Sequence, residues 1–192
     1  MSALQTTRGT AITTTTGRAS RSVFLRLLAI GIGVAGLVAD QVAKNLAIAG
    51  LDPARPIPLL GGLVTLHLTR NPGAAFSMGE SLTVVLTVVA IVALIGVCVF
   101  LVPRLAHLGW AAGTGLLLAG IAGNLTDRLF RWPSPFRGHV VDFIQLPYFA
   151  IFNVADMCIT AAAIVVIWLT VFAQVGPSGV SLKEKNKETV GG

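Results

Sequence analysis

Charged residues are scarce in this sequence, and acidic residues are fewer than basic ones. Of its 192 residues, 11% are charged, 8 are Asp or Glu, and 54% are hydrophobic. Soluble domains carry about 25% charged residues, so this composition excludes an ordinary soluble fold. The mean hydropathy of +0.82 indicates a membrane protein instead.

The sequence also has few of the residues that build disulfides, metal centres or phosphate sites. Its two cysteines, Cys98 and Cys158, fall in apolar stretches, where thiols usually serve as small hydrophobic side chains. They form no CxxC motif, and the three histidines, His67, His107 and His139, lack metal-ligand spacing. No glycine-rich phosphate loop and no serine with a convincing base is present.

Long apolar runs are what the sequence does have. A membrane-spanning helix needs roughly 20 mostly apolar residues, and four runs meet this length: Phe24–Ala47, Leu82–Val102, Leu108–Asp127 and Tyr148–Ala173. The first run is poor as a cleaved signal peptide, because Asp40, Gln41 and Lys44 separate it from the small-residue stretch that follows. The sequence therefore predicts an all-α membrane protein, an antiparallel bundle of four transmembrane helices.

The basic residues predict the orientation and the domain limits. Four spans place the N-terminal tail, the link containing Arg104 and the C-terminal tail on one side, with eight Lys or Arg against six opposite. We expect this side to be cytoplasmic. The expected division is a disordered tail over 1–22, a membrane domain over 23–174 and a second disordered tail over 175–192. The net charge of +6 is dispersed, which favours anionic lipid headgroups over nucleic acid as the partner.

Two loops on the opposite side carry strand patterns. Residues 63–70, "LVTLHLTR", and 139–146, "HVVDFIQL", have the β-branched content of short strands. Prolines 53, 56 and 58 before the first segment exclude a continuing helix. In "NPGAAF", Asn71 and Gly73 predict a turn. We expect a small extramembrane β element beside the bundle.

Four of the eight acids gather on that same side: Asp40, Asp127, Asp142 and Asp156. A carboxylate at membrane depth costs roughly 2.5–3.5 kcal/mol, so such residues are candidates for function. The sequence places polar side chains near them, namely Gln41, Lys44, Asn124, Arg128 and Asn153.

The four acids differ in what their surroundings suggest. Asp40 lies one helical turn before Lys44, which favours a local ion pair. Asp127 lies at the end of its span, where an interfacial charge usually connects the helix end to the following loop. Asp142, before the fourth span, and Asp156, expected about two turns into it, lie in apolar surroundings that favour function. Two carboxylates about 4 Å apart repel by about 4 kcal/mol at an effective dielectric of 20, so one retains a proton. This is the state that aspartic proteases use.

Five ordered motifs resemble the family of lipoprotein signal peptidases, the type II signal peptidases of bacteria. They are "DQVAK" at 40–44, "NPGAAFS" at 71–77, "GNLTDR" at 123–128, "GHVVDF" at 138–143 and "FNVAD" at 152–156. The resemblance implies a four-span aspartyl protease of the bacterial plasma membrane, with a β-cradle, a short interfacial helix and no cofactor. Its site would lie near the outer face, with both termini cytoplasmic.

The resemblance also implies roles for individual residues and a substrate. Asp142 and Asp156 would form the catalytic dyad. The residues lining the site and holding the substrate would be Asn71, Gly73, Asn124, Arg128 and Asn153, and those bracing the fold would be Asp40, Lys44 and Asp127. The substrate would be a prolipoprotein that carries diacylglycerol on a cysteine and is cleaved just before it.

Two other functions stay open from the residues alone. Membrane carboxylates also serve as proton relays, so a proton-coupled transporter is the alternative to an enzyme. Transporter sites lie near the midplane between repeated halves, whereas these acids cluster at one interface and no repeat is visible. A non-enzymatic scaffold would leave the Asp and Asn pairs unexplained.

Overall fold

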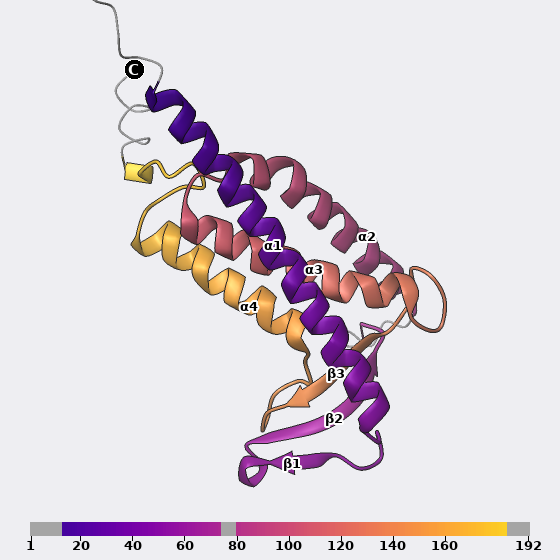
Figure 1. Cartoon of the computed structure of the whole chain (residues 1–192). Helices are drawn as coiled ribbons and strands as arrows, with labels where there is room; N and C mark the ends of the chain where they lie inside the picture. The colour runs from indigo at the N-terminus through magenta and orange to yellow at the C-terminus, as the bar shows by residue number, and fades with distance from the viewer. Residues whose placement is uncertain (1–12, 74–79, 184–192) are drawn as a thin grey trace, which may run out of the picture.

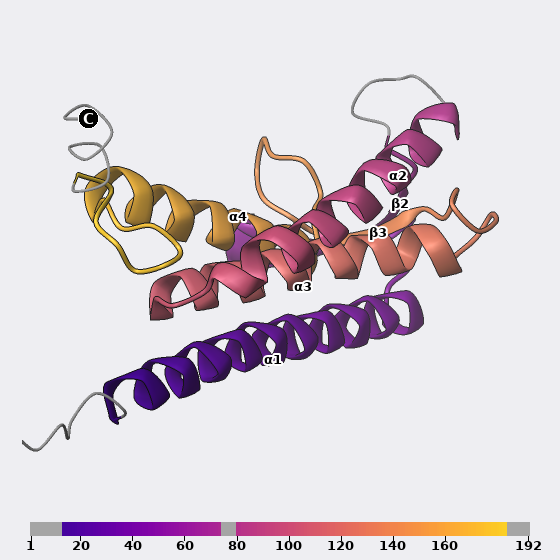
Figure 2. The same cartoon turned by 90° about the horizontal axis from the view of Figure 1, so that it is seen from above.

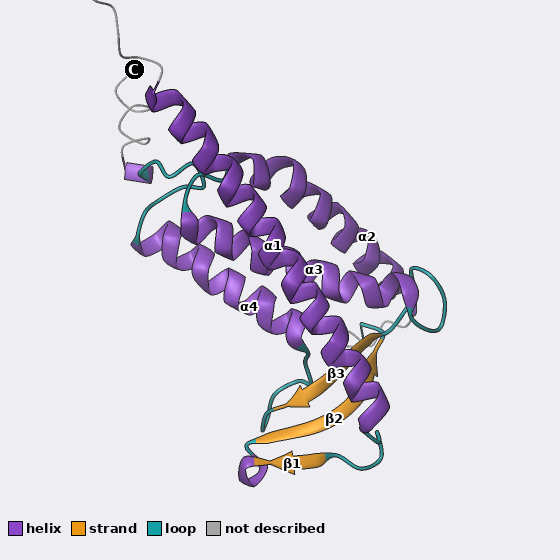
Figure 3. Ribbon diagram, viewed as in Figure 1, coloured by secondary structure: helices purple, strands orange, loops and turns teal. Residues whose placement is uncertain are grey.

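The computed structural model describes residues 13–73 and 80–183. Within them, four helices are long and apolar enough to cross a membrane, and a small sheet lies at one end of the bundle (Figures 1 and 3). The helices are α1 (Thr13–Gly50), α2 (Glu80–Gly96), α3 (Leu108–Phe130) and α4 (Val154–Ile167). The strands are β1 (Ile57–Leu59), β2 (Val64–Asn71) and β3 (Val140–Gln145). The predicted four-span bundle with an extramembrane β element is confirmed.

Helix α3 is the centre of the bundle. It packs against the three other helices, with α1 on one of its sides and α2 and α4 on the other (Figure 2). Small residues permit this close approach, as is common between membrane helices. A Cβ at Gly115 would lie 2.7 Å from the carbonyl oxygen of Ala29 on α1. A Cβ at Gly120 would lie 2.5 Å from the carbonyl oxygen of Ala155 on α4.

The three strands form an antiparallel sheet in the order β1-β2-β3. Strands β2 and β3 confirm both predicted segments, whereas β1 lies in the proline-rich stretch and was not predicted. A three-residue 3₁₀ turn, η1 (Leu60–Gly62), joins β1 and β2. Asp142 lies opposite Thr69 in the register, next to an irregularity between Leu66 and Thr69.

The fourth span begins later than predicted. Helix α4 starts at Val154, six residues after the expected Tyr148, and continues through a π-helical turn, η5 (Trp168–Phe172). Tyr148 has a positive φ of 59°, and Phe152 pairs with Ile144 as an extension of the sheet. The turn at Pro147 and Tyr148 and the pairing of Phe152 hold this stretch of backbone out of the helix. Apolar composition alone does not reveal where such a run changes from loop to helix.

Parts of both predicted disordered tails are ordered. Helix α1 begins at Thr13, so residues 13–22 are helical, because a helix already formed extends at little cost where no proline stops it. After α4, the backbone of Val175 pairs with Ser181 and accepts a hydrogen bond of 2.8 Å from the Trp110 indole. These long-range bonds leave no signal in local composition. Residues 1–12 and 184–192 lie outside the described part of the chain.

The packing at Gly120 predicts a specific loss of stability. In Gly120→Ala, the added Cβ meets the Ala155 carbonyl oxygen at 2.5 Å, and overpacking of this kind costs about 1–3 kcal/mol. The matched control is Gly31→Ala on α1, where nothing lies within 4 Å of the added atom. Thermal unfolding in detergent should give a lower Tm for Gly120→Ala only. Equal Tm values would contradict the close α3–α4 contact.

Candidate active site

The chain reverses between β3 and α4, and this reversal brings Asp142 and Asp156 to the same residue, Asn153. Strand β3 ends at Gln145, and after the loop the backbone of Phe152 exchanges hydrogen bonds of 2.9 Å with Ile144. This pairing returns the chain beside β3 just before α4 begins. Asp142 thus comes from the sheet, and Asp156 comes from the first turn of α4. The prediction that Asp156 lies about two turns into its helix is wrong, since the helix starts later.

The start of α4 is fixed by a capping box. The Asn153 side chain accepts from the Asp156 backbone N–H at 3.0 Å, and the Asp156 carboxylate accepts from the Asn153 backbone N–H at 3.1 Å. These bonds satisfy N–H groups that a helix start leaves free. They confirm the predicted polar pair and fix where Asp156 lies. The same asparagine also donates through Nδ2 to Asp142 Oδ1 at 2.6 Å.

Three asparagines therefore hold the two carboxylates. Asn153 connects Asp142 with the cap of α4, and Asn71 at the end of β2 donates to Asp142 Oδ2 at 3.0 Å. Asn124 on α3 donates to Asp156 Oδ1 at 2.8 Å. Amide groups from three elements thus converge on the candidate dyad.

The turn after β2 sets the direction of Asn71. Gly73 has a φ of +104°, which favours glycine, and its N–H donates to Asn71 Oδ1 at 2.8 Å. Because this bond holds the Asn71 oxygen, the amide nitrogen of the same side chain points toward Asp142. Residues 74–77, the rest of the "NPGAAFS" motif, lie outside the described residues.

Burial dominates the electrostatics of Asp142. The residue is 2% exposed, and its removal from water raises the carboxyl pKa from 3.8 to about 6. Hydrogen bonds from Asn71 and Asn153 act to lower this pKa, the negative charge of Asp156 raises it, and Lys44 lowers it. Asp142 therefore retains a proton at a pH where an ordinary aspartate has lost it.

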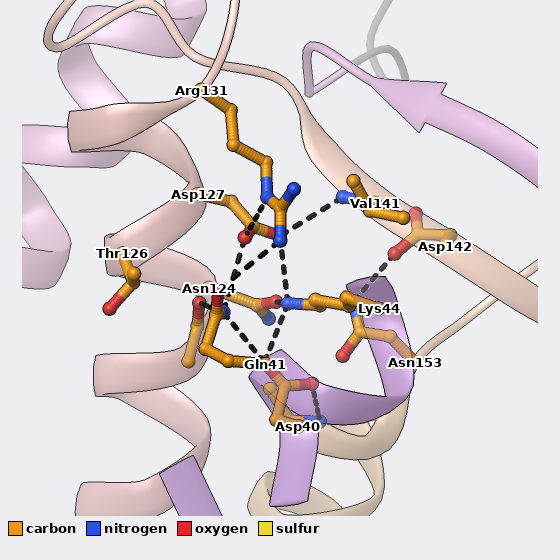
Figure 4. A network of polar contacts seen from close by, with 12 residues as sticks. Asp40, Gln41, Lys44, Asn124, Thr126, Asp127, Arg131, Val141, Asp142 and Asn153 are labelled. Atoms are coloured by element: carbon orange, nitrogen blue, oxygen red, sulfur yellow. Dashed lines mark hydrogen bonds and ion pairs between the residues drawn. The ribbon is translucent and has the colours of Figure 1, made fainter. Parts of the chain in front are cut away.

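A buried ion cluster lies near Asp142 (Figure 4). Lys44 on α1 is fully buried, and its Nζ contacts Asp40 Oδ2 at 2.9 Å and Asp127 Oδ2 at 2.8 Å. The predicted Asp40–Lys44 ion pair is confirmed. Removing one partner from a buried pair typically costs about 3–5 kcal/mol, because the other charge is left uncompensated.

Both acids of this cluster also bind backbone N–H groups of other elements. Asp127 accepts from Val141 on β3 at 3.1 Å, and Asp40 accepts from Ala155 on α4 at 2.8 Å. Asp127 thus ties the end of α3 to the sheet, as predicted. The cluster places β3 and α4, the elements that carry the candidate dyad, against α1 and α3.

Arg131 was not among the predicted site residues. Its Nε donates to Asp127 Oδ1 at 2.6 Å, and its Nη2 donates to Gln41 and Asn45 on α1. The spacing of four residues from Asp127 on one helix was the available signal. The motif pattern pointed instead to the adjacent Arg128.

Arg128 faces the candidate dyad. Its guanidinium interacts electrostatically with Asp156, Asp127 and Asp142. Its Nη1 lies 3.5 Å from the Asn124 carbonyl oxygen, and its Nε is buried without a hydrogen-bond partner among the described residues.

Within residues 13–73 and 80–183, no group of three or more His, Cys, Asp or Glu residues is placed to hold a metal ion.

The raised pKa of Asp142 predicts a pH-dependent effect of Asp142→Asn. Because this pKa is about 6 in the folded protein against 3.8 ordinarily, the bound proton stabilises the fold below about pH 4, and this stabilisation is lost as pH rises through 6. The variant lacks this loss. Between pH 4 and pH 8, the free energy of unfolding of the variant should therefore rise by about 2–3 kcal/mol relative to that of the wild type, as measured by thermal unfolding.

The control for this measurement is Asp52→Asn, which changes an exposed loop aspartate. Its Tm difference from the wild type should stay constant over the same pH range. A constant difference for Asp142→Asn as well would contradict the raised pKa.

Comparisons with known proteins agree on one family. The family model described as signal peptidase (SPase) II matches residues 32–172. A lipoprotein signal peptidase of Rhodococcus jostii is 47% identical over 145 residues, covering 76% of this chain and 73% of that protein. One of Mycobacterium avium is 44% identical over 148 residues, covering 77% and 80%.

A solved structure supports the fold. It is described as a bacterial membrane enzyme, with a TM-score of 0.66 and 27% identity, and the match covers 75% of this chain and 92% of that one. The residues matched by the family model contain all five sequence motifs and each of the four apolar helices in whole or in part. This chain therefore belongs to the signal peptidase II family and is a multi-pass bacterial membrane peptidase.

Proposed function

We propose that this protein is an aspartic endopeptidase that removes the signal peptide from diacylglyceryl-modified prolipoproteins, cutting just before the lipidated cysteine. The observation that carries the proposal is the link between Asp142 and Asp156 through Asn153, which binds both residues. Two carboxyl groups held by one residue, Asp142 by the side-chain amide and Asp156 by the backbone N–H, suit shared-proton chemistry in a chain with only 8 acids. The named relatives are lipoprotein signal peptidases, which agrees with this substrate class.

The proposed reaction uses one protonated and one ionised carboxyl group. Asp142, whose pKa is raised to about 6 by burial, donates its proton to the oxygen of the scissile carbonyl. Asp156 accepts a proton from water, whose oxygen attacks the carbonyl carbon. When the tetrahedral intermediate collapses, the C–N bond breaks and the amine nitrogen takes the proton held by Asp156. As the carboxyl product forms, a hydroxyl group of the intermediate returns a proton to Asp142, and the pair returns to its starting state.

The polar contacts suggest how the supporting residues divide their work. Asn71, Asn124 and Asn153 each donate to one of the two aspartates, so they position the dyad. Arg128 has a buried Nε with no partner among the described residues. Its guanidinium is the group we assign to the substrate backbone, where a charged donor orients the scissile bond.

An apolar groove beside Asp156 suits the apolar part of such a substrate. Its volume is about 610 Å³, and it runs along α4 beneath the loop that follows β3. Besides Asp156, its walls include Leu146, Phe149, Phe152, Met157, Ala161 and Ile164. A substrate anchored in the bilayer can place its hydrocarbon here while the scissile bond lies at the carboxylates.

The arrangement of the chain supports a site near the outer membrane face. The start of α1 and the last described residues lie at one end of the bundle, and the sheet lies at the other (Figure 1). Three arginines near the first end, Arg21, Arg26 and Arg104, fit the cytoplasmic side. We propose that both termini are cytoplasmic and that the dyad lies at the opposite interface.

Replacing either aspartate should abolish proteolysis. Asp142→Asn and Asp156→Asn each remove a carboxyl group from the proton transfers, which are worth about 10²–10⁴-fold in rate. The assay is cleavage of a diacylglyceryl-modified prolipoprotein by the purified full chain. Near wild-type turnover by either variant would refute the dyad. Proton flux in liposomes without cleavage would instead support the alternative, a proton-coupled transporter.

Filling the groove should weaken substrate binding more than catalysis. Ala161→Phe places a large ring in the groove and should raise KM by roughly 10-fold with a smaller change in kcat. The matched control is Ala163→Phe, the same change at an exposed position of α4 outside the groove. Equal KM values for the two variants would remove the groove from the substrate site.

A further inference from the structure

The buried ammonium group of Lys44 has all its hydrogen-bonding capacity used. An ammonium carries three N–H donors and no acceptor. The three partners of Lys44 are Asp40 Oδ2 at 2.9 Å, Asp127 Oδ2 at 2.8 Å and Asn124 Oδ1 at 3.0 Å. Two of these contacts neutralise charge. The third goes to a neutral amide, which charge balance does not require.

The third contact determines which way the Asn124 amide points. Because the ammonium only donates, the oxygen of Asn124 must face it, and the amide nitrogen must face away. That nitrogen donates to Asp156 Oδ1 at 2.8 Å. A reversed amide would direct an acceptor at the carboxylate and an N–H at the ammonium, and both contacts would be repulsive.

The same oxygen serves the second aspartate. Asn124 Oδ1 also accepts from Asn153 Nδ2 at 3.1 Å, and this nitrogen donates to Asp142 Oδ1 at 2.6 Å. Lys44 and Asn153 thus share one acceptor, as Figure 4 shows for the group around Asn124. The chain of bonds runs from Lys44 through the two amides to both carboxylates.

We propose that Lys44 is a positioning residue for catalysis, which fixes the amide of Asn124 and, through it and Asn153, directs hydrogen bonds at Asp156 and Asp142. The inference rests on the proposed function, because it requires that these carboxylates react. It goes beyond a bracing role for Lys44, since a brace for Asp40 and Asp127 does not need the third contact, which adds a donor that fixes the Asn124 oxygen. Supporting contacts of this kind keep reacting groups in productive geometry.

Charges from several elements act on Asp142, and Lys44 is one of them. Asp156 comes from α4, Arg128 from α3 and Lys44 from α1, while Asn71 and Asn153 supply amides. Burial raises the pKa of Asp142, and Lys44 lowers it. Loss of the ammonium should therefore move the limb of the pH–rate profile that reports Asp142 toward higher pH.

The test uses a charge-balanced variant of the full chain, Lys44→Met with Asp40→Asn. The introduced amide keeps an oxygen for the Ala155 N–H, which Asp40 binds at 2.8 Å, and Arg131 remains beside Asp127. Cleavage of a diacylglyceryl-modified prolipoprotein should show kcat lower by about 10–100-fold with KM within about threefold. The Asp142 limb should also move to higher pH. The control is Asn45→Ala at an exposed position of α1, which leaves Lys44 and its three contacts in place and should retain kcat within about threefold.

A double-mutant cycle tests the route through Asn124. Asn124→Leu should lower kcat as the charge-balanced variant does, and combining the changes should lower it little further, because both break one chain of bonds. Lys44→Arg keeps the charge, displaces the donors and should also lower kcat while the protein stays folded. This variant decides the question if the charge-balanced one does not fold.

The possible outcomes separate this inference from the proposed function. Wild-type kcat and pH profile in the charge-balanced variant, with only Tm lowered, would overturn the positioning role. Additive losses in the cycle would overturn it as well. If Asp142→Asn or Asp156→Asn retains turnover, the proposed dyad itself fails. If both abolish turnover while Lys44→Arg keeps full kcat, only the role of Lys44 fails.

Discussion

The buried contact between Lys44 and the carboxylates of Asp40 and Asp127 is the interaction on which the rest of this structure depends. All three side chains are fully buried, and neither a lone ammonium nor a lone carboxylate is tolerated in such surroundings. Asp40 binds the Ala155 N–H of α4 through its other oxygen, Oδ1, and Asp127 binds the Val141 N–H of β3 through Oδ2, the oxygen that also contacts Lys44. One cluster therefore joins α1, α3, α4 and the sheet at the end of the bundle where the candidate dyad lies.

Close backbone packing makes this cluster possible. A Cβ at Gly123 on α3 would lie 2.7 Å from Asp40 Oδ2, and a Cβ at Gly138 would overlap the Asp127 carbonyl oxygen. Gly123 leaves the space that the Asp40 carboxylate occupies, and Gly138 leaves space for the backbone at the end of α3. They also explain physically why two of the motifs begin with glycine. Electrostatics and small-residue packing thus act on the same contact, in a membrane protein whose helices gain little from hydrophobic association.

The same arrangement links stability to chemistry. Burial that raises the pKa of Asp142 costs folding free energy near neutral pH, and in the proposed reaction it keeps the proton that the scissile carbonyl receives. The amides of Asn71, Asn124 and Asn153 satisfy the carboxylate oxygens and hold them in place. Under the proposed function, a site at the membrane interface is an advantage, because a lipid-anchored substrate arrives already confined to the bilayer.

The sequence by itself determined the four apolar spans, strands β2 and β3, the side on which the acids gather and, through five motifs, the family. These features depend on local composition and spacing, which one-dimensional patterns carry. Only the tertiary structure decided the start of α4 at Val154, the pairing of Phe152 with Ile144, strand β1 and the contacts of Arg131 with α1. Each of these depends on hydrogen bonds between residues distant in sequence or on a backbone reversal. Such contacts exist only once the helices and the sheet have packed together.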